Sequence, residues 1–320
     1  MTSHSNLLSR RTFTKGIITA AGAAITGSRV GFGQTATPAH AIRLGGPVHV
    51  KYTDPEAWVA AVKDLGYSAA YCPVNAKVGD DEIKAYERAA QRANIIIAEV
   101  GAWSNPISPD TQERKAAIEK CQRQLDLADR IGARCCVNVS GSRGEQWAGP
   151  SEKNLTQETF DMIVETTRSI IDKVQPIRSF FTLETMPWAY PDSADSYLGL
   201  LKAIDRKRFA VHLDPVNLVC SPQRYFSTGK LIRECFAKLG PYIKSCHAKD
   251  IILSNKLTTH LDEIRPGLGG LDYTVFLHEV SKRKDLPLML EHLSGAKEYK
   301  LAADHVRAVA KREGLVVQSS

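Results

Sequence analysis

The feature that most restricts the fold is a regular alternation of short apolar segments with longer amphipathic ones, which runs from residue 42 to the C-terminus. The apolar segments are continuous runs, as is typical of parallel strands that helices cover. The amphipathic segments have helical spacing; in 110–131, for example, apolar residues such as Ala117, Cys121 and Leu125 recur every three or four positions. This alternation predicts an α/β fold built on a parallel sheet.

Eight strands can be assigned, each followed by a helix. The strands are expected at 41–45, 68–72, 95–100, 135–139, 180–187, 209–217, 243–250 and 286–292, and seven of the helices at 54–66, 80–94, 110–131, 156–174, 193–204, 229–239 and 296–313. The helix after the seventh strand is delayed by a long loop at 252–272, which is either a lid or a solvated loop. The count predicts a single (β/α)8 TIM barrel over 42–320. An open doubly wound sheet, the alternative, needs an early glycine-rich phosphate turn that this sequence lacks.

The N-terminus has the character of a targeting signal. Ser9-Arg-Arg-Thr-Phe-Thr-Lys15 is close to the twin-arginine export pattern, and a weakly apolar, Ala/Gly-rich run without acidic residues follows it. Ala39-His-Ala41 supplies small residues for cleavage. We therefore expect 1–41 to be a signal peptide that directs the protein to the periplasm through the twin-arginine machinery. A disordered basic tail or a membrane anchor is the alternative, but Arg29 interrupts the short run.

Charge and cysteine content exclude some classes of protein. The formal net charge is +7, of which four positive charges lie in the predicted signal, so the remainder is nearly balanced. No basic run is interleaved with aromatic residues, and nucleic acid is therefore not an expected partner. No later run is apolar enough for a stable membrane span. Most of the seven cysteines lie in apolar strand or helix segments and are expected in the core; a homo-oligomer is compatible with this composition.

Four consecutive predicted strands each end near a side chain that can bind a metal ion: Glu184, Asp214, His247 and Glu291. The strands of a barrel all point their carboxyl ends to one face, where catalytic residues gather. A lone buried glutamate is usually part of an ion pair, but four such groups at matching positions predict a metal site. Three carboxylates and one imidazole suit one divalent ion, Mn²⁺ first and Mg²⁺ or Co²⁺ as alternatives, rather than a structural zinc.

Several motifs resemble those of a known family. Glu184-Thr-Met-Pro187, Leu213-Asp-Pro-Val-Asn217, His247-Ala-Lys-Asp250, Pro266-Gly-Leu-Gly-Gly-Leu-Asp-Tyr273 and Leu290-Glu-His292 are similar to motifs of the xylose isomerase-like TIM barrels, the sugar phosphate isomerases and epimerases that include the D-tagatose 3-epimerase group. The resemblance implies that the four predicted ligands bind Mn²⁺ or a similar ion. It also implies that Glu184 and Glu291 form the catalytic pair that transfers protons.

The sequence departs from the epimerases of this family at two positions. Those enzymes usually have a His three residues after the aspartate of strand six, where this chain has Asn217, and an Arg six residues after the metal-binding His, where it has Leu253. Asn217 and Arg265 are the candidates to bind substrate in place of these residues. The departures bear on the substrate and leave the predicted metal site intact.

The residues also indicate a reaction class on chemical grounds. To invert or move a stereocentre beside a carbonyl, an enzyme must remove a weakly acidic C–H proton, and a metal ion that binds the carbonyl and a neighbouring hydroxyl stabilises the enediolate. Two carboxylates on opposite faces can take the proton and return it. We therefore predict a metal-dependent isomerase or epimerase of a sugar or polyol derivative. A dehydratase or lyase acting on a keto-inositol or 3-keto sugar would use the same parts. A non-catalytic periplasmic carbohydrate-binding protein is the alternative outside enzymes.

Further residues are candidates for binding a carbohydrate or supporting the site. His212 and Lys249 share strand phase with Asp214 and His247, so both should face the barrel interior or its mouth. A core histidine is the alternative for His212, and a structural ion pair for Lys249. For Glu99, on the third strand, we favour a buried ion pair.

Two tryptophans at strand ends are candidates to stack on a sugar. Trp188 follows the fifth strand directly, and Trp103 follows the third. Asp250 comes one residue after Lys249 and three after His247, and it is expected to hold one of them in place.

Overall fold

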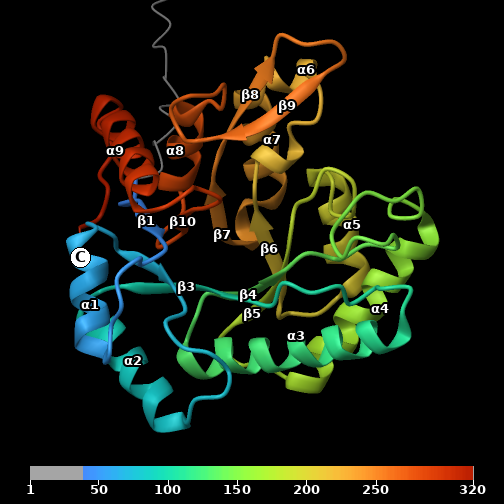
Figure 1. The fold of residues 1–320 in the computed structure, drawn as a ribbon, viewed down its shortest axis with the longest axis horizontal. Coiled ribbons are helices and arrows are strands. Elements are labelled where there is room, and N and C mark those ends of the chain that lie inside the picture. Colours follow the sequence, from blue (N-terminus) through green and yellow to red (C-terminus); the bar gives the residue numbers. More distant parts are fainter. Residues whose placement is uncertain (1–38, 320) are drawn as a thin grey trace, which may run out of the picture. The chain divides into compact units, whose positions relative to one another are not determined.

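The computed structural model describes residues 39–319 and confirms the closed barrel. Eight parallel strands pair in the ring order β1-β10-β7-β6-β5-β4-β3-β2, and β1 closes the ring by pairing with both β10 and β2. The barrel strands are β1 (Arg43–Gly46), β2 (Ala69–Tyr71), β3 (Ile96–Gly101), β4 (Cys135–Asn138), β5 (Phe180–Glu184), β6 (Phe209–Leu213), β7 (Ile243–Ala248) and β10 (Pro287–Leu290). Figure 1 shows this single α/β barrel with its helices outside the strands.

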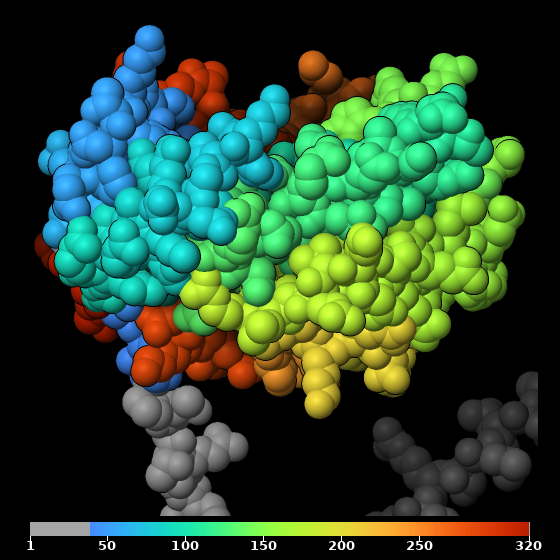
Figure 2. All heavy atoms as spheres, turned by 90° about the horizontal axis from the view of Figure 1, so that it is seen from below, coloured from blue at the N-terminus to red at the C-terminus, as the bar shows by residue number. Residues whose placement is uncertain are grey.

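The helices follow the strands in the predicted rhythm. They are α1 (Pro55–Asp64), α2 (Asp80–Arg92), α3 (Thr111–Ile131), α4 (Gln157–Val174), α5 (Ala194–Ile204), α6 (Pro222–Tyr225), α7 (Thr228–Leu239), α8 (Tyr273–Ser281) and α9 (Ala296–Arg312). Side chains such as Asp54, Asp110 and Thr156 cap helix N-termini by accepting backbone N–H groups. In Figure 2 the segments coloured from cyan to yellow-green, which include α2, α3 and α4, form a continuous outer surface.

The inside of the barrel is apolar at one level and polar at the next. Ala69, Ala98 and Met289 form a small cluster of buried apolar side chains that is separate from the main core between strands and helices. One residue further along β3, the buried Glu99 begins a group of polar side chains. The barrel therefore changes from apolar packing to polar contacts toward the carboxyl ends of its strands, where the predicted site lies.

The prediction of a loop at 252–272 was wrong in its first part. Strands β8 (Asp250–Ser254) and β9 (His260–Ile264) pair there as an antiparallel hairpin outside the barrel. Figure 1 shows the hairpin extending from the end of β7. Its strands are mostly half-buried or exposed. β8 has only the three-residue apolar run Ile251-Ile252-Leu253, and β9 has no continuous apolar run. The connecting turn also lacks the glycine that usually signals a hairpin.

The predicted signal peptide at 1–41 falls almost wholly outside the described residues, and so do its paired arginines. Within 39–319, no helix is both long and apolar enough to cross a membrane.

Candidate metal centre

The four predicted ligands come from four neighbouring barrel strands. Glu184 is the last residue of β5, Asp214 directly follows β6, His247 lies near the end of β7, and Glu291 directly follows β10. These strands are adjacent in the ring, so their carboxyl ends meet on one face. One ligand atom from each residue lies within 4.8 Å of the others, which is close enough for a single ion.

One nitrogen of His247 faces all three carboxylates. Nδ1 lies 2.9 Å from Oε2 of Glu291, 3.1 Å from Oε1 of Glu184 and 3.9 Å from Oδ2 of Asp214. The histidine and two of the carboxylates are almost fully buried, while the Glu291 side chain keeps 15% of its surface exposed. Nδ1 is therefore the nitrogen that would bind a metal, and Glu291 is the ligand closest to solvent.

The donor atoms of this cluster fit a divalent cation. Oδ2 of Asp214 and Oε2 of Glu291 are buried without a well-oriented hydrogen bond from any described residue, although buried polar atoms are normally satisfied. Lys249 lies nearby, with Nζ 2.7 Å from Asp214 Oδ2 and 3.4 Å from Glu291 Oε2. Three carboxylates and one ammonium leave two negative charges when the histidine is neutral, which a divalent cation would balance.

Burial makes the negative charge of this cluster costly. It raises the pKa of Asp214 to about 6, with Lys249 opposing that shift and Glu184 adding to it. Burial also disfavours the ammonium of Lys249, but Asp214 and the neighbouring glutamates outweigh burial and raise its pKa well above the usual range. Lys249 is thus held in its charged form, and Asp214 is a carboxylate that a bound cation would keep ionised.

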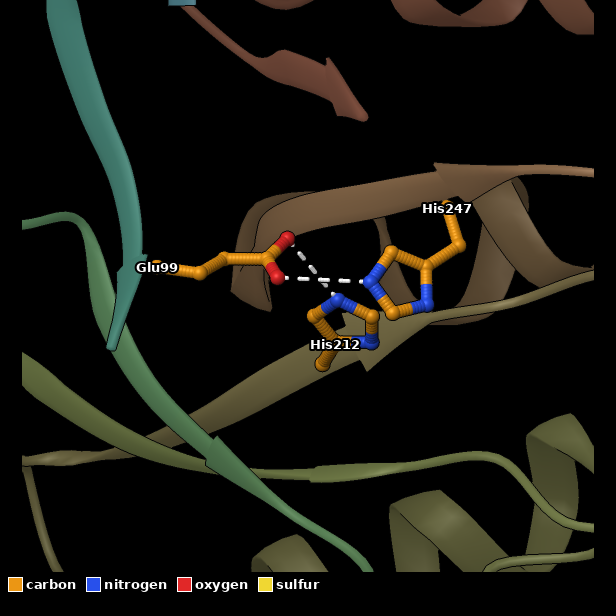
Figure 3. Close-up of side chains that lie close together, drawn as sticks. All are labelled: Glu99, His212 and His247. Carbon is orange, nitrogen blue, oxygen red and sulfur yellow. Dashed lines mark hydrogen bonds and ion pairs between the residues drawn. The ribbon is translucent and has the colours of Figure 1, made fainter. Parts of the chain in front are cut away.

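The other nitrogen of His247 is held by a buried acid. Nε2 lies 3.3 Å from Oε2 of Glu99, and Nε2 of His212 lies 3.0 Å from Oε1 of the same carboxylate. Ser245 donates a hydrogen bond to Glu99 as well. Figure 3 shows both imidazoles converging on Glu99 from β6 and β7. Glu99 is therefore buried with two histidine partners, as the expected ion pair requires in part, and its contact with Nε2 orients the His247 ring so that Nδ1 points to the carboxylates.

Hydrogen bonds from the loop that follows β6 fix two of the carboxylates, Glu184 and Asp214. Asn217 donates from Nδ2 to Glu184 Oε1 at 3.1 Å and to the carbonyl oxygen of Thr185. Oδ1 of Asp214 accepts the backbone N–H of Val216 at 2.9 Å. Asn217 therefore acts as a clamp between the ends of β5 and β6.

A cavity of about 470 Å³ opens above the cluster. Its walls include the predicted substrate-binding residues Trp103, Trp188, Asn217 and Lys249. The full lining is Trp103, Val139, Trp147, Ala148, Glu184, Met186, Pro187, Trp188, Asn217, Lys249, Glu263, Glu291 and His292. A concave site of this size with acidic groups at one side is the arrangement expected for a small-molecule site.

The sequence as a whole matches one protein family. A family model described as Xylose isomerase-like TIM barrel matches residues 59–309, which is most of the chain. The chain belongs to the xylose isomerase-like TIM barrel family. No protein with a curated function matches the sequence significantly.

Solved structures of this fold resemble the protein at low sequence identity. A D-psicose 3-epimerase crystallised in the presence of D-fructose has a TM-score of 0.61 and 16% identity, covering 87% of this chain and 100% of its own. A probable 3-DHS dehydratase from Bacillus anthracis has a TM-score of 0.61 and 17% identity, covering 85% and 99%. A xylose isomerase-like TIM barrel protein from Mycobacterium smegmatis in complex with magnesium has a TM-score of 0.59 and 16% identity, covering 85% and 95%. These similarities establish a shared fold.

Two predicted substrate-binding residues of this xylose isomerase-like barrel do not line the cavity. Nε of Arg265 lies 2.8 Å from Oε2 of Glu298 on α9, so its guanidinium is engaged on the outside of the barrel. His212 is completely buried and hydrogen-bonded to Glu99, which places it below the cavity floor. A core position was the stated alternative for His212.

Asp250 supports a loop and not the two residues beside it in sequence. Its carboxylate accepts the backbone N–H groups of Gly267, Gly269 and Leu271, at 3.0, 3.1 and 2.9 Å. A side chain at position 269 would collide with Asp250, so glycine is required for this contact. Asp250 therefore shapes the loop that links β9 to α8. The residue that orients His247 is instead Glu99, far away in sequence.

Three cavity residues with aromatic or ionisable side chains were not among the predicted site residues. Trp147 lies in the loop between β4 and α4, Glu263 lies on β9, and His292 directly follows Glu291. Glu263 joins the group through Lys249 Nζ at 3.0 Å and His292 Nδ1 at 2.9 Å. The signal for Trp147 was its place in a loop at the carboxyl face, where an exposed aromatic residue is a candidate for binding.

Proposed function

We propose that this protein is a metal-dependent isomerase or epimerase of a sugar or polyol derivative. The observation that carries the proposal is the arrangement of Glu184 and Glu291. Their carboxylates lie about the same nitrogen of His247, at 3.1 and 2.9 Å, and both line the same cavity. A binding protein has no need of two carboxylates that converge on one point beside a metal site.

The two glutamates suit a pair of groups in which one takes a proton from the substrate and the other returns a proton to it. Burial opposes ionisation of Glu184, but the neighbouring His247 outweighs burial and lowers the pKa of that carboxyl. Oε1 of Glu184 faces Asn217 and His247, and Oε2 of Glu291 faces His247. The remaining oxygens, Oε2 of Glu184 and Oε1 of Glu291, are thus the atoms we assign to proton exchange with the substrate.

The other residues of the site would bind the metal ion or the substrate, or orient the side chains that do so. A divalent cation, Mn²⁺ in our proposal, would supply the electrophile that makes a C–H beside a carbonyl acidic. Asp214 and His247 would hold that ion together with the two glutamates, Glu184 and Glu291. Glu99 would keep His247 in the required orientation. Lys249, buried at the cavity wall and fully charged, would bind a hydroxyl or carbonyl oxygen of the substrate.

The proposal is tested by deuterium exchange. The protein purified without its N-terminal 41 residues is incubated in D₂O with a panel of keto sugars, with added Mn²⁺ and with chelator. We expect metal-dependent incorporation of deuterium beside the carbonyl and formation of an epimer or isomer, followed by NMR. Formation of an unsaturated product with loss of water would assign the dehydratase reaction instead. Binding of the sugars without any exchange would return the protein to a carbohydrate-binding role.

A further inference from the structure

Three tryptophans contribute to the lining of the cavity. Trp147 and Trp188 both line it, and they keep 45% and 39% of their surfaces exposed. They come from the loops after β4 and β5, and Trp103, from the loop after β3, lines the same space. Large apolar side chains that remain exposed in a hollow next to polar groups indicate a place where a ligand covers them.

A hydrogen bond from a side chain to the backbone links the loops that carry the two exposed tryptophans. Trp188 donates from Nε1 to the carbonyl oxygen of Ala148, the residue next to Trp147, at 2.8 Å. A second bond joins the same two loops, from the hydroxyl of Tyr190 to the carbonyl oxygen of Leu155 at 3.1 Å. The polar atom of Trp188 is therefore already used, and its ring is held in place at the cavity wall while 39% of the residue's surface stays exposed. Such pre-organisation reduces the entropic cost of binding a flat ring.

The charges that line the cavity disfavour an anionic ligand. Among the described lining residues, the basic ones are Lys249 and His292, against the carboxylates of Glu184, Glu263 and Glu291. Lys249 lies 2.7 Å from Asp214 and 3.0 Å from Glu263, and His292 lies 2.9 Å from Glu263. Both already have acidic partners, so apart from a metal ion bound by the four clustered side chains, a phosphate group would find no unpaired cation among the described lining residues and would share the cavity with the carboxylate of Glu263.

We infer that Trp147 and Trp188 form a second subsite for an uncharged ring bonded to the reacting sugar, so that the substrate is a neutral glycoside. The ring is either a second sugar or an aromatic group; both offer an apolar face for stacking on indole. The cavity of about 470 Å³ is in the range that holds ligands larger than a single sugar ring. The inference rests on the proposed function, because it places the reacting ring beside Glu184 and Glu291.

Binding constants test the subsite. Calorimetry on the Mg²⁺-loaded protein compares fructose, fructose 6-phosphate, lactulose (a galactosyl-fructose) and phenyl β-D-glucoside. We expect at least one of the two-ring compounds to bind about 10-fold or more tightly than fructose, and fructose 6-phosphate to bind more weakly than fructose. Lactulose and the phenyl glucoside distinguish a sugar ring from an aromatic one.

Variants of the two tryptophans test whether they cause the tighter binding of two-ring ligands. Trp147→Ala and Trp188→Ala should each bring the affinity ratio between two-ring ligands and fructose close to one, while Trp147→Phe should retain most of the preference. Tyr242→Ala is the control, because Tyr242 is 45% exposed and lies just before β7, at the opposite end of the strand. Thermal unfolding of each variant checks that it is folded.

The outcomes separate the subsite from the proposed function. Equal affinity for one and two rings, tighter binding of the phosphate, or an undiminished preference in Trp147→Ala would overturn the subsite. Tryptophan-dependent binding of a two-ring ligand, with no C–H exchange in any sugar, would support the subsite and refute the proposed function. C–H exchange on fructose without any preference for a two-ring ligand would support the proposed function and refute the subsite.

Discussion

At the scale of single residues, the site depends on one acid buried in the barrel. Glu99 accepts hydrogen bonds from His212, from Ser245 and from Nε2 of His247. Burial opposes its ionisation, but the two histidines outweigh burial and hold the pKa of Glu99 well below its usual range. A permanent carboxylate at this position requires a proton on Nε2 of His247, which leaves the Nδ1 lone pair free for a metal.

We predict that Glu99→Gln weakens metal binding about 10- to 100-fold, because the amide oxygen is a poorer acceptor and the amide group can also face the histidine as a donor. The dissociation constant is measured by competition with a metal-binding dye. Glu165→Gln, a surface change on α4, is the matched control. Wild-type affinity in Glu99→Gln would show that Glu99 has only a packing role.

At the scale of elements, the sequence predicted the barrel strands and most helices but missed the β8–β9 hairpin. Barrel strands and helices leave strong periodic signals because they are buried along one face or on both sides. The hairpin packs on the core through few residues, such as Ile251 and Leu261, and the acidic residues of β9, such as Glu263, made the segment resemble a loop. The contact that matters, from Glu263 to Lys249, joins residues that only the folded hairpin brings together.

The candidate site, too, contains residues that could be predicted from the sequence and residues that could not. The cluster of four candidate metal ligands could be predicted because each residue lies at an equivalent position of a repeating unit. The partners of Asp250 and Arg265 could not, because these side chains turn toward a loop and toward α9 and strand phase says nothing about either. Trp147 lies in a long connection without periodicity, so its approach to Trp188 depends on the loop conformation.

One junction between elements supplies a test of stability. Asp129 near the end of α3 accepts the backbone N–H groups of Arg178 at 2.6 Å and Ser179 at 2.8 Å, which anchors the start of β5. Burial opposes its ionisation, but these backbone hydrogen bonds outweigh burial and lower the pKa of Asp129. Asp129→Asn should therefore reduce the free energy of unfolding by about 1 kcal/mol at pH 7, a value that allows for solvent screening at this half-buried site.

The loss of unfolding free energy in Asp129→Asn should depend on pH in a definite direction. A carboxylate whose pKa is lower in the folded state stabilises the fold above its unfolded pKa of about 3.9, and this contribution disappears as the pH falls through the folded value. The difference between wild type and Asp129→Asn should be constant from neutral pH down to about 5 and should shrink below about 4. Urea unfolding at several pH values measures it. Asp126→Asn, which loses an exposed pair with Arg130, should cost less than about 0.5 kcal/mol, and an equal cost in both variants would contradict the role of Asp129.

At the scale of the whole molecule, we expect the barrel and the N-terminal segment to have separate roles. The barrel at 42–320 carries all of the described chemistry, and the twin-arginine motif at 9–15 is expected to determine where it acts. Export by that pathway moves folded proteins, so the free, mostly buried cysteines and a metal loaded beforehand are compatible with it.

We expect replacement of Arg10 and Arg11 by lysine to leave the full-length precursor inside the cell, because the export receptor reads the arginine pair. Fractionation and immunoblotting of a tagged protein measure its location and size. Arg29→Lys, a change outside the motif, should leave export unchanged. Processed protein outside the cell in the double variant would refute the export signal.

The most direct test of the central claim is deuterium incorporation into each of two epimeric sugars by Glu184→Gln and Glu291→Gln. Each variant keeps the shape of the site but loses one base, so turnover should fall roughly 10²- to 10⁴-fold with substrate still bound. If the glutamates act on opposite faces of the substrate carbon, each variant should still exchange the C–H of one epimer without converting it to the other. Full epimerisation in either variant would remove that glutamate from the reaction, and full epimerisation in both would contradict the proposed mechanism.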